Sequence, residues 1–378
     1  MDSKKILVIV IAAIVVIGGV TAVVVSNNNN NDKEKETISI AYLNLGYYPF
    51  MVGFEKGYFD NLDFNVKPIV VTGSGQDAVN AVLAGDATMA ATGDAPFINT
   101  LGKYPDKLVG LTQYTQSSGS LAGHIWIANN SLKGSLDAIE KDADGVVSNS
   151  ATTAAQIKEI TANKEGSGKD GTFSIGVING STTHTNIRKW CLSNDLTYDE
   201  GALEDSLKTG VDVHIIQVPK GSDAGVLITY LEKVDALATN KTLNGNIMSA
   251  IGDKVYAFGD SSALSGTSYS VLCTTQANYD KYKDQMIQVL EVLKEIEEWI
   301  KNNVEEASKI CADLSNDKAE TIAKNINGAN YKVIWDTNEK NYDSWVQTAK
   351  INGYDISVET FINACPCKDT INAWYAKA

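Results

Sequence analysis

The sequence predicts an α/β protein of two lobes, each a mostly parallel sheet flanked by helices, followed by a helical C-terminal region. Three observations favour this class. Short strand-like runs alternate with helical segments from residue 38 onward, and a second series of the same kind begins near residue 125. This alternation is typical of parallel strands joined by crossover helices. The length of 378 residues also exceeds one small module and suggests two lobes.

The first series contains four expected strands and three expected helices. The strands are short runs bounded by turn residues, at 38–42, 64–71, 87–91 and 108–113. Two helices are expected at 49–57 and 76–83, each ending at a glycine. Asp94 is expected to cap a third helix, with Pro96 in its first turn.

The second series has the same rhythm and is interrupted by an insertion. Strands are expected at 125–128, 173–178, 211–218, 236–239, 254–258 and 268–273. Helices should run from the 180–184 turn to residue 193 and over 227–234. Residues 141–170 are polar and rich in Gly and Ser, and predict an insertion with one helix near 154–162. The last hundred residues should be mainly helical, with a core-packing stripe made by Tyr282, Met286, Val289, Leu293, Ile296, Ile300, Val304 and Ala307.

Composition excludes several classes of protein. A hydrophobic share of 44% is ordinary globular usage and excludes disorder as the main state. The formal net charge is −14, and no basic stripe is present to neutralise phosphates, so we expect no nucleic-acid partner. Three histidines leave little room for a multi-histidine metal site. The motifs of serine hydrolases, zinc proteases and P-loop enzymes are missing from the sequence. We therefore expect no enzyme activity, cofactor or metal.

The five cysteines are too few and too dispersed for a disulfide scaffold. Cys365 and Cys367 are two residues apart, and we expect their sulfurs to be poorly placed to bond each other. Outside the cell, pairing with Cys311 is plausible. A structural role is expected for the pair.

Residues 6–25 form an apolar run that, as a helix, spans about 30 Å, the thickness of the hydrocarbon core. Lys4 and Lys5 precede it, so the chain that follows should lie outside the cytoplasm. The length of the run and its poor cleavage site favour an uncleaved anchor over a cleaved signal, although both remain open. Residues 26–37 are polar and should form a solvated tether.

Four polar turns that contain glycine lie between an expected strand and a helix, at 44–48, 73–76, 92–94 and 180–184. The first N–H groups of a helix lack intrahelical partners and carry the positive end of its dipole. Glycine lets a ligand approach them, and Ser and Thr add hydroxyl donors, so these turns favour a small anion site. The alternative is that Ser and Thr merely cap the helices. His184 could contact a ligand, lie on the surface or bond the other lobe.

The candidate ligand-binding residues come from these turns and from neighbouring strand ends. They are Asn44, Gly46, Tyr47, Tyr48, Ser74, Gly75, Gln76, Thr92, Gly93, Asp94, Tyr114, Ser181, Thr182, Thr183, His184, Thr239 and Asn240.

Several motifs follow one another at close spacing. The first block comprises the segments 48–50, 55–59, 73–75, 78–81, 85–87 and 92–96, and two supporting segments lie at 180–184 and 235–240. Together they resemble the solute-binding proteins of ABC importers for nitrate, sulfonates, taurine and bicarbonate. The resemblance covers roughly residues 38–275. The sequence departs from that family where an expected Glu-Pro is replaced by Lys241-Thr242, so the identity of the ligand does not carry over.

The resemblance implies a type II periplasmic-binding fold that traps a ligand between two lobes. One lobe would comprise residues 38–122 and 265–378, and the other 123–264, with crossovers near 121–127 and 263–269. The implied partners are an ABC permease and its ATPase, together with a membrane that holds the N-terminal segment. The binding domain would lie outside the cell membrane, anchored or secreted after cleavage.

Other functions remain open. A branch of this fold makes a thiamine pyrimidine, but the enzymes of that branch carry a cysteine-rich cluster that this sequence lacks. A binding module for sensing without transport is a further alternative. Hydroxyls and helix starts favour a sulfonate or related oxyanion as the ligand. Tyr42, Tyr47, Tyr48, Tyr114 and Trp126 could instead stack on an aromatic heterocycle such as a pyrimidine.

Overall fold

The computed structural model describes residues 35–44, 46–72, 74–117, 124–129, 132, 150–202, 206–219, 222–252, 254–260, 268–315 and 317–374. The chain divides into two units, Met1–Glu34 and Lys35–Ala378. The expected apolar anchor and almost all of the expected tether lie outside the described residues. Among the helices that are described, none is both long and apolar enough to cross a membrane.

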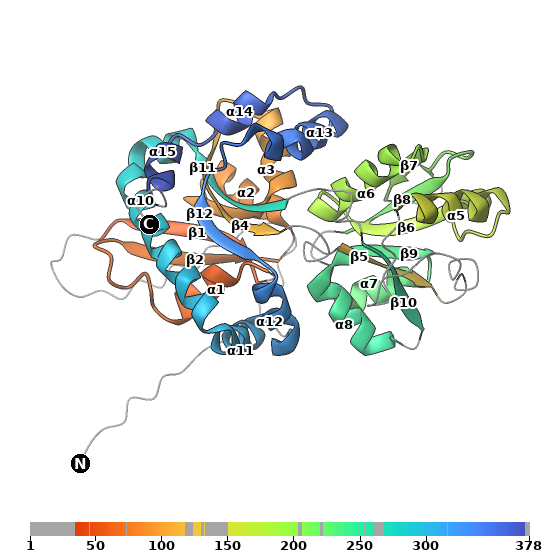
Figure 1. The fold of residues 1–378 in the computed structure, drawn as a ribbon, viewed down its shortest axis with the longest axis horizontal. Coiled ribbons are helices and arrows are strands. Elements are labelled where there is room, and N and C mark those ends of the chain that lie inside the picture. The colour runs from red at the N-terminus through yellow and green to blue at the C-terminus, as the bar shows by residue number, and fades with distance from the viewer. Residues whose placement is uncertain are drawn as a thin grey trace, which may run out of the picture. The chain divides into compact units, whose positions relative to one another are not determined.

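The first sheet has six strands in the order β12-β4-β11-β3-β1-β2 (Figure 1). β1 is parallel to both β2 and β3, whereas β11 runs antiparallel to β3 and β4, and β12 runs antiparallel to β4. The strands are β1 (Thr37–Leu43), β2 (Asn65–Val71), β3 (Met89–Gly93), β4 (Leu108–Ser117), β11 (Ser268–Thr275) and β12 (Asn330–Ile334).

The second sheet also has six strands, in the order β10-β5-β9-β6-β8-β7. The four strands β9, β6, β8 and β7 are parallel, and β5 and β10 are antiparallel to their neighbours. The strands are β5 (His124–Asn129), β6 (Phe173–Ile178), β7 (Tyr198–Gly201), β8 (Val213–Val218), β9 (Ala236–Asn240) and β10 (Val255–Asp260). The α/β class is thus confirmed, with parallel strands in both sheets and antiparallel pairs in each as well.

The chain enters the second sheet after β4 and returns to the first with β11. The connecting residues 118–123 and 261–267 lie outside the described residues, and so do parts of both expected crossovers. The sequence did not predict β7, β12 or the helix α8 (Lys241–Ile251). The third strand starts two residues later than expected and continues to Gly93.

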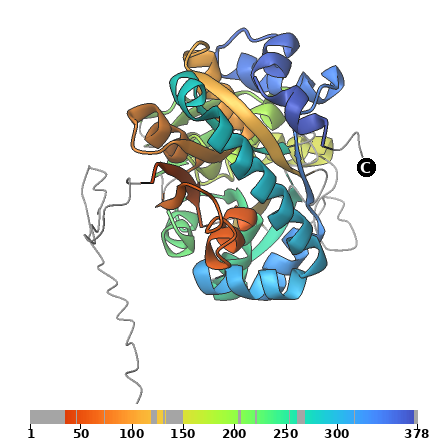
Figure 2. The same cartoon turned by 90° about the vertical axis from the view of Figure 1, so that its left-hand side faces the viewer.

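Three helices follow the first strands: α1 (Tyr48–Glu55), α2 (Gly75–Ala84) and α3 (Asp94–Lys103). Their ends follow local rules. Pro49 lies in the first turn of α1, and Gly85 ends α2 in the left-handed conformation, with φ of 85°. The long helix α10 (Gln276–Asn302) crosses a face of the first sheet (Figure 2). Most of the expected stripe is buried, although it is divided between α10 and the next helix, because α10 ends at Asn302 and Val304 and Ala307 follow it; Tyr282 and Val304 are only partly buried.

The C-terminal region adds five helices to the first sheet. They are α11 (Val304–Ser315), α12 (Ala319–Asn327), α13 (Asp343–Ile351), α14 (Val358–Asn363) and α15 (Lys368–Asn372), with a short 3-10 turn at Glu339–Tyr342. An aromatic cluster fixes α13 against α3, because Trp345 meets Phe97, Trp335, Tyr342 and Phe361 at centroid distances of 5.1–6.2 Å. A Cβ atom at Gly110 would lie 2.3 Å from the Trp335 ring, so glycine is needed there.

The second sheet is covered on both faces, and each face has its own core. On one face α5 (Ser150–Ala162) and α6 (Thr182–Ser193) pack Ile157 and Trp190 against Ile175 of β6. On the other face α7 (Ala224–Leu231) and α8 pack Leu227 and Ile247 against the sheet. A short 3-10 turn, Lys169–Gly171, precedes β6. The helix expected within 141–170 is α5, which begins at Ser150.

β2 forms one edge of the first sheet. Lys67 and Pro68 are exposed in the middle of this strand, and Val70 is 46% exposed near its end. Proline has no N–H to donate and is normally confined to such edge positions.

Candidate functional site

The candidate site lies where the first turns of helices from both sheets approach each other. β3 ends at Gly93 and leads into α3, and α6 of the second sheet begins at Thr182. A Cβ atom added at Gly93 would lie 2.8 Å from Thr182 Oγ1. Real Cβ atoms essentially never approach another heavy atom that closely. The two turns are therefore in contact, and glycine at position 93 leaves the room for it.

Two buried threonine hydroxyls lie near strand ends in the two sheets: Thr92 comes just before Gly93 in β3, and Thr239 comes just before the last residue of β9. Thr92 of β3 is 0% exposed and Thr239 of β9 is 2% exposed. Neither hydroxyl has a hydrogen-bond partner among the described residues. Tyr47 lies close to Thr92. Burial, and after it the Asp94 carboxylate, raise the pKa of Tyr47, and the Thr92 hydroxyl lowers it. The two hydroxyl groups do not meet the distance and angle criteria of a hydrogen bond. Because buried hydroxyls are normally paired, Thr92 and Thr239 are the strongest candidates to contact a solute.

The start of α2 contributes its backbone more than its side chains. Ser74 and Asp77 form a capping box, in which Asp77 accepts bonds from the Ser74 N–H at 2.7 Å and from the Ser74 hydroxyl at 3.1 Å. The Gln76 amide donates to Asn80 and Thr100. A Cβ atom at Gly75 would lie 2.5 Å from Thr92 Oγ1, so this turn lies directly against the unpaired threonine.

The start of α6 is held by a network of its own. The Ser181 hydroxyl caps the helix by accepting the His184 N–H at 3.1 Å. His184 Nδ1 accepts the Gly180 N–H at 3.1 Å, and Nε2 lies 2.9 Å from Glu200. The bond from Gly180 assigns the proton to Nε2. Arg188 also donates to Glu200, through two nitrogens.

This network changes the expected role of His184. The side chain is 2% exposed and both ring nitrogens are engaged within the second sheet's own elements. His184 therefore orients the start of α6 and has no ring nitrogen left for a ligand. The expected ligand contact by His184 is thus wrong. Although burial raises the pKa of Glu200, bonds from His184 and Arg188 outweigh it and lower that pKa to about 2. Thr183 is buried beside His184, at 5% exposure.

Two further candidates lie away from the contact between the sheets. Tyr48 is buried in the core of the first sheet, where its hydroxyl accepts a bond from the Asn325 amide at 3.0 Å. The Asn44 amide donates to the Leu314 carbonyl at the end of α11. Both side chains join α1 and its preceding turn to the C-terminal helices. Their expected ligand contacts are therefore replaced by structural ones.

The remaining aromatic candidates divide in the same way. Tyr42 stacks on Phe54 and is a core residue. Tyr114 is also 0% exposed with its ring edge-on to Phe50, but its hydroxyl has no hydrogen-bond partner among the described residues, so it stays a candidate. Tyr47 lies just before α1 and beside Thr92, which keeps it at the candidate site. Gly46 adopts φ of 82° in the turn before it. Asn240 ends β9, and its side chain, like that of Trp126, lies outside the described residues.

Asp94 places a carboxylate at the site. Its Oδ1 accepts the Ala95 N–H at 2.8 Å, and Oδ2 accepts the Tyr269 N–H at 3.3 Å. The opposing charge comes from Lys189 of α6, which is 5% exposed. Burial lowers the pKa of Lys189 to about 8, and attraction to Asp94 opposes that shift.

Two seams join the helices of the two sheets, and the sequence predicted neither. In one seam Lys189 donates to Ser344 of α13, and Arg188 donates to Asn352 at 2.6 Å. The other joins α8 to the start of α12. There Asn246 donates to Asp317 at 3.0 Å and Lys318 donates to Ser249 at 2.8 Å. Arg188 and Lys189 are adjacent basic residues in a chain of net charge −14, and this pairing could have indicated the first seam from the sequence.

The model of the NMT1-like family matches residues 31–315. The chain belongs to the NMT1-like family. The helices α12 to α15, and with them Ser344 and Asn352, follow the stretch that the model of the NMT1-like family matches. No curated protein sequence matches the chain significantly.

Solved structures similar to this NMT1-like protein share its fold at low identity. The periplasmic nitrate-binding protein NrtA from Synechocystis PCC 6803 is 14% identical, with a TM-score of 0.61 over 91% of this chain and 88% of that one. The alkanesulfonate-binding protein SsuA from Xanthomonas axonopodis pv. citri is 11% identical, with a TM-score of 0.60 over 88% and 99%. The aliphatic sulphonate binding protein SsuA from Escherichia coli is 13% identical, with a TM-score of 0.59 over 86% and 91%. The expected periplasmic-binding-protein fold is confirmed.

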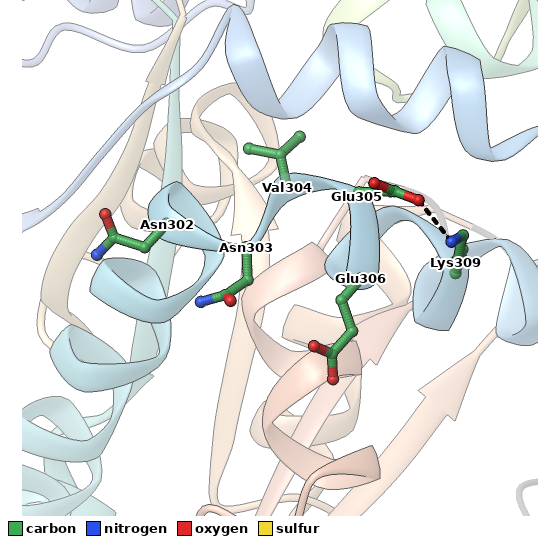
Figure 3. A pocket seen from close by; sticks show the side chains of 6 residues that line it. All are labelled: Asn302, Asn303, Val304, Glu305, Glu306 and Lys309. Atoms are coloured by element: carbon green, nitrogen blue, oxygen red, sulfur yellow. Dashed lines mark hydrogen bonds and ion pairs between the residues drawn. The ribbon is translucent and has the colours of Figure 1, made fainter.

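The NMT1-like chain also has a surface hollow of about 470 Å³ at the junction of α10 and α11. Figure 3 shows its lining, in which Lys309 pairs with Glu305 at 2.6 Å; the other residues are Asn302, Asn303, Val304 and Glu306. All six come from one stretch of chain, and none belongs to the strand ends described above. Within the described part of the chain, no cluster of three or more His, Cys, Asp or Glu side chains could hold a metal ion.

Proposed function

We propose that this protein is an extracytoplasmic solute-binding protein that captures a small ligand between its two sheets and delivers it to an ABC importer. One observation carries the proposal: the buried Thr92 hydroxyl, which has no hydrogen-bond partner among the described residues, lies next to the contact between Gly93 and Thr182, and Thr239 offers a second such hydroxyl near the end of β9. Each sheet supplies half of this arrangement. A ligand bound there would draw both halves together, as hinge closure requires.

The proposed ligand is a sulfonate or a related oxyanion. The helices α2, α3 and α6 all begin at this place, and helix starts favour negative charge. Threonine hydroxyls can donate to oxyanion oxygens without adding charge. Lys189 counters the Asp94 carboxylate, so Asp94 does not make the site repel an anion. The names of the similar structures, which bind sulfonates or nitrate, support the same class.

Location and partners rest on the same comparison and on the N-terminal sequence. Two of the similar proteins are described as periplasmic. The apolar residues 6–25 suit an anchor or a signal that would place the binding unit outside the membrane. An ABC permease and its ATPase would then receive the loaded protein. A sensing role without transport would use the same site.

Asp94 favours a second candidate ligand. A carboxylate at the site can accept a bond from an amino group, and Tyr47 beside it offers an aromatic face. An amino-substituted heterocycle such as a pyrimidine would use both groups. The expected difference from an oxyanion is that Asp94→Asn would then abolish binding instead of preserving it.

A thermal-shift screen tests the proposal. Residues 35–378 would be mixed with inorganic oxyanions, alkyl sulfonates and aminopyrimidines. A ligand at 100 times its dissociation constant should add about 2.7 kcal/mol to the free energy of unfolding. Stabilisation by a sulfonate or nitrate supports the anion reading. If only the pyrimidines stabilise the protein, the oxyanion class is wrong.

A further inference from the structure

Two cysteine sulfurs near the C-terminus lie against each other in the core. Cys365 Sγ and Cys367 Sγ are 3.6 Å apart, with side chains that are 0% and 2% exposed. Both also lie within hydrogen-bonding distance of the Leu111 carbonyl, at 3.3 and 3.4 Å. The sequence led us to expect sulfurs poorly placed to bond each other. The turn around Pro366 instead brings them together.

The other three cysteines lie on other elements, and Cys273 of β11 pairs with Gly110 of β4, next to Leu111. All five cysteines are free thiols. Cys311, the partner considered from the sequence, lies in α11 near Tyr42 and Tyr331, whose phenol pKa values it helps to raise. Cys191 belongs to the core of the second sheet, and Cys273 lies within β11. Burial raises the pKa of all three.

We propose that Cys365 and Cys367 form a reversible disulfide, which makes this turn a redox-sensitive modification site. The sulfurs are 3.6 Å apart and both lie against one carbonyl, so rotation of the two side chains, with adjustment of the turn around Pro366, would bring them to the bonding distance of about 2 Å. The proposal takes from the proposed function only the extracytoplasmic setting, where disulfides persist.

The reaction consumes an external disulfide, and because both sulfurs are buried it requires the 364–367 turn to open locally or the chain to be refolding. A thiolate of the pair attacks one sulfur of a disulfide such as oxidised glutathione, forming a mixed disulfide and releasing one glutathione thiolate. The second cysteine loses its proton to solvent and attacks the mixed disulfide, which releases the second glutathione. Two S–H bonds are lost, one S–S bond forms, and the oxidant takes up two electrons. Cys367 suits the first step, because its bond with Cys365 lowers its pKa whereas burial raises that of Cys365.

The disulfide would change the contacts between the C-terminal segment and β4. Ala364 accepts the Gly110 N–H at 2.8 Å, so three consecutive contacts join residues 364–367 to residues 110–111. Oxidation removes the S–H protons that the thiol form shares between the two sulfurs and the Leu111 carbonyl. The thiol form and the disulfide form therefore hold the last helix on the sheet through different contacts.

Mass spectrometry of the full chain tests the proposal directly. Tryptic cleavage after Lys350 and Lys368 yields one peptide that contains Cys365 and Cys367 and no other cysteine. The protein would be equilibrated across ratios of reduced to oxidised glutathione, and would also be refolded from denaturant in the same buffers. It would then be alkylated under denaturing conditions. We expect two alkyl groups on this peptide in reducing buffer and none, with a loss of two hydrogens, in oxidising buffer.

Single variants and the other cysteines supply the controls. Cys365→Ser and Cys367→Ser should each leave one cysteine that is alkylated or glutathionylated and never internally bonded. Cys191, Cys273 and Cys311 should stay alkylated throughout. Two alkyl groups at every ratio, refolded samples included, would overturn the proposal, as would a cross-linked peptide joining either cysteine to Cys311. Ligand affinity does not enter this measurement, so its failure is separate from failure of the proposed function.

Discussion

The ammonium group of Lys189 donates to both oxygens of Ser344, at 3.0 Å to the carbonyl and 2.8 Å to the hydroxyl. Lys189 lies on α6 of the second sheet, whereas Ser344 begins α13, which the aromatic cluster fixes to the first. The bond therefore joins the two halves of the candidate site. Burying a lysine ammonium group costs free energy unless its N–H donors are paired. The Lys189–Ser344 bonds therefore favour the arrangement in which α6 and α13 are in contact.

Replacing Lys189 with methionine should weaken ligand binding. A hydrogen bond to a charged group contributes roughly 1.5–3 kcal/mol, so its loss from the joined state should lower affinity about tenfold or more. Calorimetry with the ligand found by screening would measure this. Lys158→Met, at an exposed position on α5, is the matched control and should bind as the wild type does. Equal affinity in both variants would show that the seam does not stabilise the bound state.

The Thr92→Val and Thr239→Val variants should bind ligand weakly and remain stable. Neither hydroxyl has a partner among the described residues, so valine removes no bond in the ligand-free protein. Thr274→Val is the matched control, because that buried hydroxyl does donate to the Thr88 carbonyl at 2.6 Å. It should lose about 1 kcal/mol of stability and keep its affinity. If Thr92→Val and Thr239→Val instead lose stability and keep their affinity, the two threonines do not belong to the binding site.

Gly93→Ala should hinder the approach of the two turns. The added methyl would lie 2.8 Å from Thr182 Oγ1, whereas φ of −80° at Gly93 suits alanine, so the backbone itself is unstrained. We expect weaker binding, with affinity partly restored in Gly93→Ala/Thr182→Ala. Gly225→Ala is the control, at an exposed helical position whose nearest atom is 3.3 Å away. Binding by Gly93→Ala at the wild-type level would mean that the contact is dispensable.

Ser181→Ala separates helix capping from ligand binding. The Ser181 hydroxyl caps α6 and can still donate its own proton, so its loss should cost about 1 kcal/mol of stability and also weaken binding. Ser357 caps α14 in the same way, accepting the Thr360 N–H at 3.2 Å. Ser357→Ala should lose similar stability with unchanged affinity. Melting curves and titrations of the two variants, taken together, decide whether Ser181 is more than a cap.

The Glu200 network should make stability fall in acid. The pKa of Glu200 is lowered from 4.5 to about 2 in the folded protein, so its contribution is complete above pH 4.5 and is lost as the pH falls toward 2. Urea unfolding of the wild type and of Glu200→Gln should therefore differ most above pH 4.5 and converge below it. Glu291→Gln, which alters an exposed side chain of α10, should show no such convergence.

Local signals predicted the elements that begin or end the site. Pro96 marked the start of α3, although the cap position belongs to Gly93 and not to Asp94 as expected, and the 180–184 turn marked α6. Those signals act over a few residues, so a sequence displays them. The strand β12 was missed although Tyr331 and Val333 alternate as buried residues of high strand propensity, because its five residues lie in a region read as mainly helical.

Side-chain roles were harder to predict than elements. Tyr48 follows a glycine turn and was read as a ligand contact, yet the helical face it occupies turns inward to Asn325. His184 lost its expected role because Glu200, sixteen residues later, occupies its second nitrogen. Lys189 resembles an ordinary solvated lysine until α13, more than 150 residues away, covers it. Each of these roles depends on a partner distant in sequence, which the residue pattern does not encode.

The edge strand β2 bears on the protein's behaviour at high concentration. An unpaired strand edge is a template onto which a strand of another molecule can add, and this is a common route to aggregation. Pro68 removes a donor from the middle of that edge, and Lys67 beside it would bring like charges together in a stacked pair. The exposed Val70 is thus left on an edge that a second molecule cannot readily extend, which should help keep the protein monomeric.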